Sequence, residues 1–115
     1  MWKRRKKKSH GAAGGDQLLL RQLEKLGADL SLPRSTRHYL YFPAEPDATQ
    51  AAQLLEGEGY AIEQRPGADG ANWLVLASRT EVVDAESVAQ FRSRLTEMAS
   101  SLGGEYDGWE AAPKP

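Results

Sequence analysis

The chain has 115 residues, with 15 Lys and Arg, 16 Asp and Glu, and no cysteine. This length suits one ordinary domain, which buries enough surface to fold without a metal or a disulfide. The lack of cysteine excludes disulfides, thiolate zinc sites and cysteine nucleophiles, and it favours a reducing compartment.

Charge is distributed unevenly along the chain. Residues 1–10 contain six of the basic side chains and no acidic one, which leaves 9 basic and 16 acidic side chains, a balance of −7. We therefore expect a disordered basic arm over residues 1–15, an acidic domain over 16–112 and a tail over 113–115. The arm lacks the apolar segment of a signal peptide, and no stretch has the length of a membrane span, so we predict a cytoplasmic protein without membrane contact.

The first folded element is predicted to be a helix over residues 16–26, with Asp16 as its N-cap and Gly27 as its end. Its apolar side chains fall on one side at helical spacing: Leu19, Leu20, Leu23 and Leu26. Pro33 lies in a loop that leads to "RHYLYF", residues 37–42, which is typical of a strand covered on much of both faces.

A second helix is predicted over residues 44–59. Pro46 suits its first turn, and Glu45 or Asp47 would be its cap. Four side chains would form its buried side: Ala48, Ala51, Leu54 and Leu55.

Two strands follow at residues 60–65 and 72–78, joined by the hairpin loop "PGADG". Asp84 would cap the longest helix, which Gly103 ends. Its apolar residues recur every three or four positions: Val88, Phe91, Leu95, Met98 and Leu102. The segment 105–110 alternates like an edge strand.

This order, a helix followed by β-α-β-β-α-β, predicts an α+β fold: a ferredoxin-like sandwich with an extra N-terminal helix. The first and third strands should be central, because they are the apolar ones. The second and fourth should be edges that resist strand addition, because they carry the charged residues Glu63, Arg65, Glu105, Asp107 and Glu110.

Few residues suit catalysis or metal binding. His38 shares strand parity with Leu40 and Phe42, so we interpret it as a structural histidine, and no cysteine or second nearby histidine completes a metal site. The nucleophile elbow, the phosphate loop and the calcium-loop spacing are absent from the sequence. We predict no catalytic residue, metal or cofactor; an enzyme would need a pocket that gathers His38 with acidic residues.

Alternation along the strands assigns side chains to the two sheet faces. The helix-covered face is predicted to hold Leu40, Phe42, Ile62, Leu74, Leu76 and Tyr106. The opposite face would hold Tyr39, Tyr41, Trp73, Val75 and Trp109, with Glu63, Glu105 and Asp107 at its margins. Either the leading helix covers this second face, or the face is a partner-binding surface with aromatic anchors and an acidic rim.

Two classes of partner fit such a face. Aromatic sheets bind RNA in the RNA recognition motif, but the third strand, "NWLVLAS", lacks the required basic-glycine-aromatic run, and acidic side chains repel phosphate. Charge complementarity favours a basic polypeptide. Direct nucleic-acid binding stays as the alternative, through the sheet aromatics and the arm residues Lys3, Arg4, Arg5, Lys6, Lys7 and Lys8.

The segments "ADLSLPRSTRHYLYFP", "WLVLAS" and "GGEYDGWE" resemble the RraB family, regulators of ribonuclease E activity, and the resemblance spans about residues 20–110. It implies a ferredoxin-like protein inhibitor, not an enzyme, that binds the non-catalytic, Arg-rich part of ribonuclease E and slows the decay of some RNAs. We therefore expect a non-enzymatic regulator that is a monomer or weak oligomer and binds a basic segment of a ribonuclease E-like protein.

Overall fold

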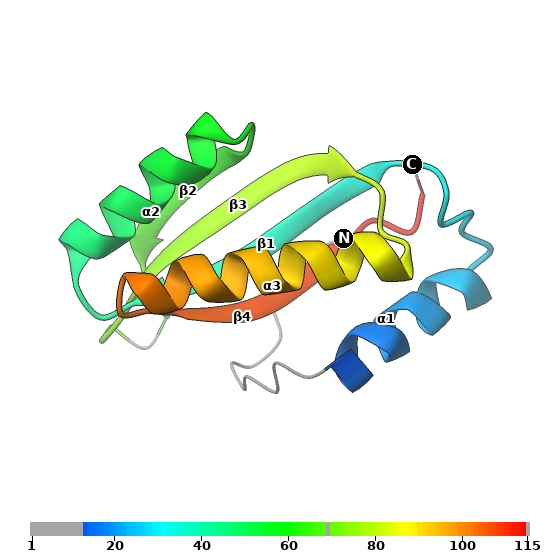
Figure 1. Cartoon of the computed structure of the whole chain (residues 1–115), viewed down its shortest axis with the longest axis horizontal. Coiled ribbons are helices and arrows are strands. Elements are labelled where there is room, and N and C mark those ends of the chain that lie inside the picture. The colour runs from blue at the N-terminus through cyan, green and yellow to red at the C-terminus, as the bar shows by residue number, and fades with distance from the viewer. Residues whose placement is uncertain (1–12, 69, 115) are drawn as a thin grey trace.

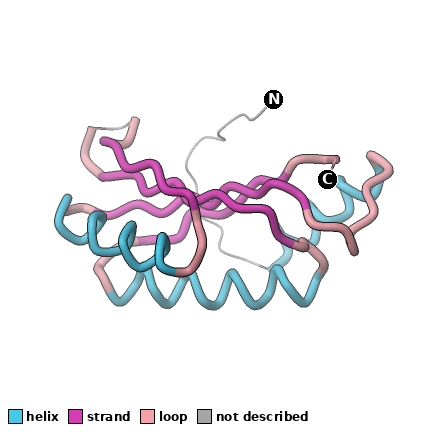
Figure 2. Tube along the Cα trace, turned by 90° about the horizontal axis from the view of Figure 1, so that it is seen from above, coloured by secondary structure: helices cyan, strands magenta, loops and turns pink. Residues whose placement is uncertain are grey.

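In the computed structural model, which describes residues 13–68 and 70–114, helices pack on one side of a four-stranded antiparallel sheet (Figures 1 and 2). The described elements are α1 (Ala13–Lys25), β1 (Arg34–Phe42), α2 (Glu45–Gly57), β2 (Ala61–Pro66), β3 (Trp73–Glu81), α3 (Ala85–Ser101) and β4 (Glu105–Ala111). The strand order β2-β3-β1-β4 places β1 and β3 in the centre. The predicted ferredoxin-like arrangement with an N-terminal helix is confirmed.

None of the helices in these described ranges combines the length and the hydrophobicity that a membrane crossing requires.

The central strands are longer than predicted. β1 begins at Arg34 instead of residue 37, and β3 extends to Glu81 instead of residue 78. The added residues pair with each other, since Arg34 lies opposite Glu81 and Thr36 opposite Arg79. Pairing between two distant segments therefore extends both strands into stretches whose local sequence is typical of loops.

The predicted signals at both ends of α3 are confirmed. Asp84 is its N-cap and accepts a hydrogen bond from the backbone N–H of Ser87 at 2.8 Å. Gly103 follows the helix with φ of 77°, a left-handed conformation that suits glycine. The buried side of α3 holds Val88, Phe91, Leu95, Met98 and Ala99.

The predictions for α2 are confirmed in part. Its N-cap is Ala44, without a side-chain hydrogen bond, so the prediction of Glu45 or Asp47 as the cap is wrong. Leu54 is 46% exposed, whereas Ala52 is buried. Ala48, Ala51, Ala52 and Leu55 form the buried stripe at i, i+3, i+4 and i+7, and this phase leaves Leu54 outside it.

Helix α1 begins at Ala13, three residues before the predicted start, and it ends before Leu26, which is 69% exposed. Leu20 and Leu23 join the main hydrophobic core. The helix packs beside α3, on the same side of the sheet as α2 (Figure 2). The hypothesis that the leading helix covers the opposite face is therefore wrong.

A β-bulge in β4 changes which side chains face the helices. Tyr39 pairs with Gly108 and Leu40 pairs with Tyr106, so β4 has one residue more than β1 at this point. Gly108 takes φ of 120° in this bulge, a conformation in which L side chains are strained. As a result Tyr106 and Trp109, three positions apart, both point to the helices and join the main core.

The register of β3 reverses the predicted faces of that strand. Val75 lies opposite Leu40 and Trp73 opposite Phe42, and directly paired residues share a face, so Trp73 and Val75 face the helices. Leu74 and Leu76 share the other face with the β1 tyrosines. The predictions for all four β3 residues are wrong, because the strand is apolar on both faces and its alternation carries no phase information.

Candidate functional site

The sheet face opposite the helices carries a cluster of four large side chains, which we call the sheet-face patch: Tyr39, Tyr41, Leu74 and Leu76. The central strands supply them as two cross-strand pairs, Tyr39 with Leu76 and Tyr41 with Leu74. The cluster is separate from the main core, because the sheet itself divides the two. No described helix lies on this side (Figure 2).

Charged residues of both edge strands flank the patch. On β2, Glu63 lies opposite Leu76 and Arg65 opposite Leu74, and these two exposed charged side chains form an ion pair with each other.

On β4, Glu105 lies opposite Tyr41 and Glu110 opposite Arg37. The Tyr39 hydroxyl donates to Glu110 Oε1 at 2.8 Å. Burial, followed by this hydrogen bond to a carboxylate, raises the pKa of Tyr39.

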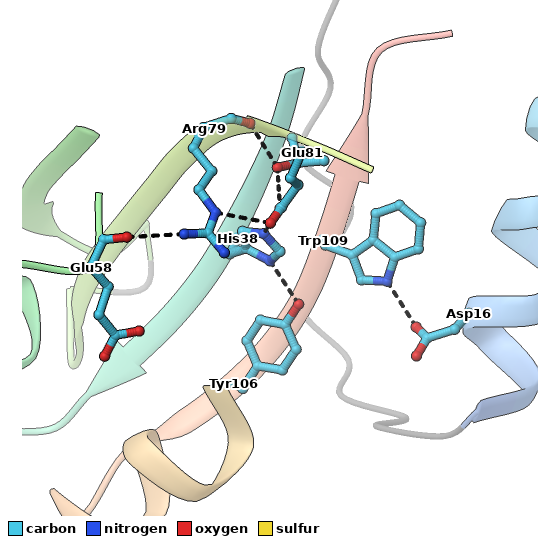
Figure 3. A network of polar contacts seen from close by, with 8 residues as sticks. Asp16, His38, Glu58, Arg79, Glu81, Tyr106 and Trp109 are labelled. Carbon is cyan, nitrogen blue, oxygen red and sulfur yellow. Dashed lines mark hydrogen bonds and ion pairs between the residues drawn. The ribbon is translucent and has the colours of Figure 1, made fainter. Parts of the chain in front are cut away.

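The helix-covered face contains a buried polar cluster around His38 (Figure 3). His38 Nε2 lies 2.6 Å from Glu81 Oε2, and Nδ1 lies 2.9 Å from the Tyr106 hydroxyl. Burial lowers the pKa of His38, so the ring is neutral at pH 7. In that state Nε2–H donates to the Glu81 carboxylate and Nδ1 accepts the Tyr106 hydroxyl proton, which satisfies both ring nitrogens.

Glu81 connects this cluster to the rest of the sheet. Arg79 Nε donates to Glu81 Oε1 at 3.0 Å, and the Thr36 hydroxyl contacts the other oxygen. Burial alone would raise the pKa of Glu81, but the hydrogen bonds from His38, Thr36 and Arg79 outweigh burial and hold that pKa at about 2. The carboxylate is therefore ionised at every physiological pH.

Arg79 extends the cluster toward the end of α2. Its guanidinium lies 4.0 Å from the centre of the Tyr60 ring and donates from Nη1 to the Glu58 carbonyl at 3.0 Å. Burial first, and then the nearby Glu81 charge, raises the pKa of Tyr60 to about 12. These contacts bind β1, β3 and the α2–β2 turn together.

A second polar cluster holds α1 in place. Asp16 accepts from Trp109 Nε1 at 2.9 Å and from Arg92 Nη2 at 2.8 Å, and it forms an ion pair with Arg92. Trp109 also packs edge-on against Phe91. One carboxylate thus joins α1 to α3 and β4.

In chemical terms the two faces differ. The His38 cluster satisfies its own polar groups inside the fold, and among the described residues no set of His, Cys, Asp or Glu could hold a metal ion. The sheet-face patch instead combines aromatic and aliphatic side chains with charged residues at its margins.

The chain matches a known protein family. The model of the family "Regulator of ribonuclease activity B", RraB, matches residues 15–111. The chain belongs to the RraB family. No curated protein sequence matches it. RraB proteins are regulators of ribonuclease activity, which points to a ribonuclease as the partner of this RraB chain.

The predicted binding residues of this RraB chain fall into three groups. Tyr39, Tyr41, Glu63 and Glu105 come together on the patch side, and Asp107 lies in the β4 bulge. Trp73 and Trp109 face the helices, so placing them on the opposite face is wrong. The predicted nucleic-acid-binding residues lie outside the described residues: Lys3, Arg4, Arg5, Lys6, Lys7 and Lys8.

Sequence reasoning missed five residues of this face: Arg37, Arg65, Leu74, Leu76 and Glu110. Arg37 and Arg65 have the same strand parity as Tyr39 and Glu63, so alternation alone could have found them. Leu74, Leu76 and Glu110 needed the cross-strand register and the position of the bulge.

Proposed function

We propose that this RraB chain is a non-enzymatic, cytoplasmic regulator that binds a basic segment of a ribonuclease E-like protein through the sheet-face patch. The observation that carries the proposal is the family match together with the acidic balance of residues 11–115, which hold 9 basic and 16 acidic side chains. An acidic body attracts an Arg-rich segment and accelerates its encounter. Binding of such a segment would reduce the decay of RNAs that the ribonuclease degrades.

The arrangement of the patch supports this choice of surface. Tyr41 is partly exposed and provides a large ring of the kind that dominates binding energy at protein interfaces, and the buried side chains of Tyr39, Leu74 and Leu76 pack beside it. Carboxylates lie at both margins, on β2 and β4. A basic segment laid across the strands would place apolar side chains on the centre and cations at the edges.

The environment of His38 supports a role without catalysis. Both ring nitrogens are engaged inside the fold, and the imidazole has no exposed surface. A general base must reach the proton it abstracts, and this ring contacts only groups of its own core. We therefore assign His38 to stability, and we expect regulation by a monomer or weak oligomer through contact alone.

The direct test is a titration with a fluorescent peptide from the Arg-rich, non-catalytic part of ribonuclease E, followed by anisotropy. We expect saturable binding that weakens about tenfold between low and physiological salt, because screening acts on exposed charges. An absence of binding at low salt would refute the proposed function.

Two matched pairs of variants locate the surface. Tyr41→Ser should weaken binding about tenfold, whereas Leu54→Ser, which removes an exposed apolar side chain from α2, should leave it unchanged. Glu63→Gln on the patch side should weaken binding more than Glu97→Gln on α3, although each variant removes one negative charge. Equal effects within each pair would mean that the partner does not use the patch.

Direct RNA binding is the second candidate, favoured by the six cations among residues 1–10. The geometry weakens it, because Trp73 and Trp109 lie on the helix side and only the two tyrosines are left for base stacking. Titration of single-stranded RNA distinguishes the two functions. If RNA bound more tightly than the basic peptide, and Tyr41→Ser weakened that binding, the RNA function would replace the one proposed here.

A further inference from the structure

The chain itself contains a segment with the chemistry that the proposed function assigns to the partner. Residues 1–10 have six Lys and Arg, no acidic residue, and an aromatic side chain, Trp2. We call residues 1–12, which precede the described part, the basic arm. The body to which this arm is joined has seven more acidic than basic side chains. We therefore expect the positively charged arm and the negatively charged body of the same chain to attract each other.

The basic arm joins the body next to the edge of the sheet. It continues directly into α1, and Asp16 in the first turns of that helix bonds to Trp109 of β4 and Arg92 of α3. β4 is an edge strand. The helix-covered face is already filled by the main core, whereas no described helix occupies the face beyond β4 (Figures 1 and 2).

The length of the basic arm is sufficient to cross the whole sheet. Twelve extended residues span about 40 Å at roughly 3.3 Å per residue. Four strands about 4.8 Å apart measure only about 15 Å from the first to the last. The arm can therefore leave α1 beside β4, pass over the sheet-face patch and reach β2.

The chemistry of that face matches the basic arm. Glu105 and Glu110 lie at the β4 margin, nearest to the start of α1, and Glu63 lies at the β2 margin. Glu63 also forms an ion pair with Arg65, so the β2 margin carries charges of both signs. The apolar centre between the margins suits Trp2.

We infer that the basic arm binds the sheet-face patch of its own chain and competes there with the basic partner. The docking rests on the charges and geometry above, and the competition rests also on the proposed function. A tethered segment acts at a millimolar effective concentration, so a weak contact is enough to reduce the apparent affinity of a free ligand. The arm would make regulation selective, because only a partner that binds the sheet-face patch more strongly than the arm would displace it.

Competition is tested in the full chain with an arm-neutral variant, in which Lys3, Arg4, Arg5, Lys6, Lys7 and Lys8 are each replaced by Gln. The probe is the same Arg-rich fluorescent peptide. We expect it to bind the arm-neutral variant at least fivefold more tightly than the unchanged chain, and a synthetic peptide of residues 1–12 to reverse the gain.

A control corrects for net charge, which any loss of cations makes more negative. The double variant Arg21→Gln, Lys25→Gln removes two exposed cations from α1 without touching the arm. Its gain in affinity per charge gives the non-specific effect. If the arm-neutral variant gains no more per charge than this control, the competition is overturned.

Docking is tested separately by nuclear magnetic resonance. The chain has no cysteine, so Ser9→Cys carries a single nitroxide label. We expect the label to broaden the amide signals of Leu74 and Leu76 and to spare those of Gln53 on α2 and Gln90 on α3. Broadening that is absent, or equal on both sides of the sheet, overturns the docking.

A mixed sample identifies the occupant. Labelled chains without ¹⁵N are combined with ¹⁵N chains without the label, and broadening in this sample would assign the patch to the arm of a second copy and overturn binding within one chain.

The two proposals fail in different ways. Selective broadening without any binding of the probe peptide upholds the docking and refutes the proposed function. Equal probe binding by the unchanged chain and the arm-neutral variant, without broadening, refutes the docking and leaves the proposed function standing.

Discussion

The two faces of one sheet differ in composition and in exposure to the helices, although β1 contributes alternate residues to both. On the helix side, His38, Leu40 and Phe42 have no exposed surface and belong to the main core or its polar cluster. On the other side, Tyr39 and Tyr41 belong to a small cluster flanked by charges. The ring nitrogens of His38 on the first face are satisfied within the fold, whereas the charges of the second face lie at its margins.

This difference between the faces predicts how substitutions on each of them should act. A change on the helix side removes packing or a buried hydrogen bond, so it should lower the free energy of unfolding. A change on the patch side should alter binding more than stability. The following predictions test whether substitutions on the helix side mainly affect stability and those on the patch side mainly affect binding.

The largest loss of stability is expected for Phe91→Ala. The Phe91 ring is buried and packs edge-on against both His38 and Trp109. Its removal leaves a cavity between α3 and the sheet, at a cost of about 3–5 kcal/mol. Urea unfolding measures the change, and Gln90→Ala on the exposed side of the same helix should stay within about 0.5 kcal/mol. A loss below about 1 kcal/mol would show that Phe91 is not a core residue.

Glu81→Gln should follow, with a loss of about 2–3 kcal/mol at pH 7. The neutral amide cannot replace the ionised acceptor shared by His38, Thr36 and Arg79, and it leaves buried donors poorly paired. Glu97→Gln is the exposed control.

The same variant has a characteristic pH dependence. The pKa of Glu81 is about 2 in the fold against an ordinary 4.5, so its carboxylate stabilises the fold above pH 4.5, and this contribution is lost as the pH falls toward 2. The lowered pKa of His38 likewise gives stability that is present above its ordinary 6.5 and declines below it. Glu81→Gln should flatten the stability profile below pH 4.5; an unchanged slope there would contradict the assignment.

Gly103→Val should cost about 1–2 kcal/mol. This glycine follows α3 with φ of 77° and leads into β4. A β-branched residue is strained in this left-handed conformation. An added Cβ meets no atom within 4 Å, so the loss comes from the backbone conformation alone. Gly57→Ala, at the end of α2 and without a positive φ, is the control. Equal thermal melting of Gly103→Val and the unchanged chain would refute the left-handed stop.

The smallest change in stability is expected for Glu63→Gln on the patch side. Its ion pair with Arg65 is about half exposed at both ends, and exposed pairs contribute little. We expect less than about 0.5 kcal/mol by urea unfolding, together with the weaker peptide binding described above. A stability loss as large as that of Glu81→Gln would remove the distinction between the two faces.

Local sequence was sufficient for the elements and for the fold. Asp84 and Gly103 bound α3, because capping and left-handed glycine act within a few residues. Apolar first and third strands and charged second and fourth strands predicted the sheet order, since edges must resist further pairing. Tyr39 and Tyr41 were placed on the correct face because β1 alternates regularly, since the extra residue of the bulge lies in β4.

Only the tertiary structure decided how the faces are composed. In β3 apolar residues occupy both parities, so register with β1, and not alternation, assigned Trp73 to the helices and Leu74 to the patch. In β4 a single inserted residue moved Trp109 to the helix side, where Asp16 of α1 accepts its indole N–H. Arg34 was likewise predicted to lie in a loop, but it is fully buried in β1. Its guanidinium donates hydrogen bonds to the carbonyls of Asp29, Ala112 and Pro113. Each of these placements depends on contacts with segments that are distant in the chain, so a local sequence pattern could not predict it.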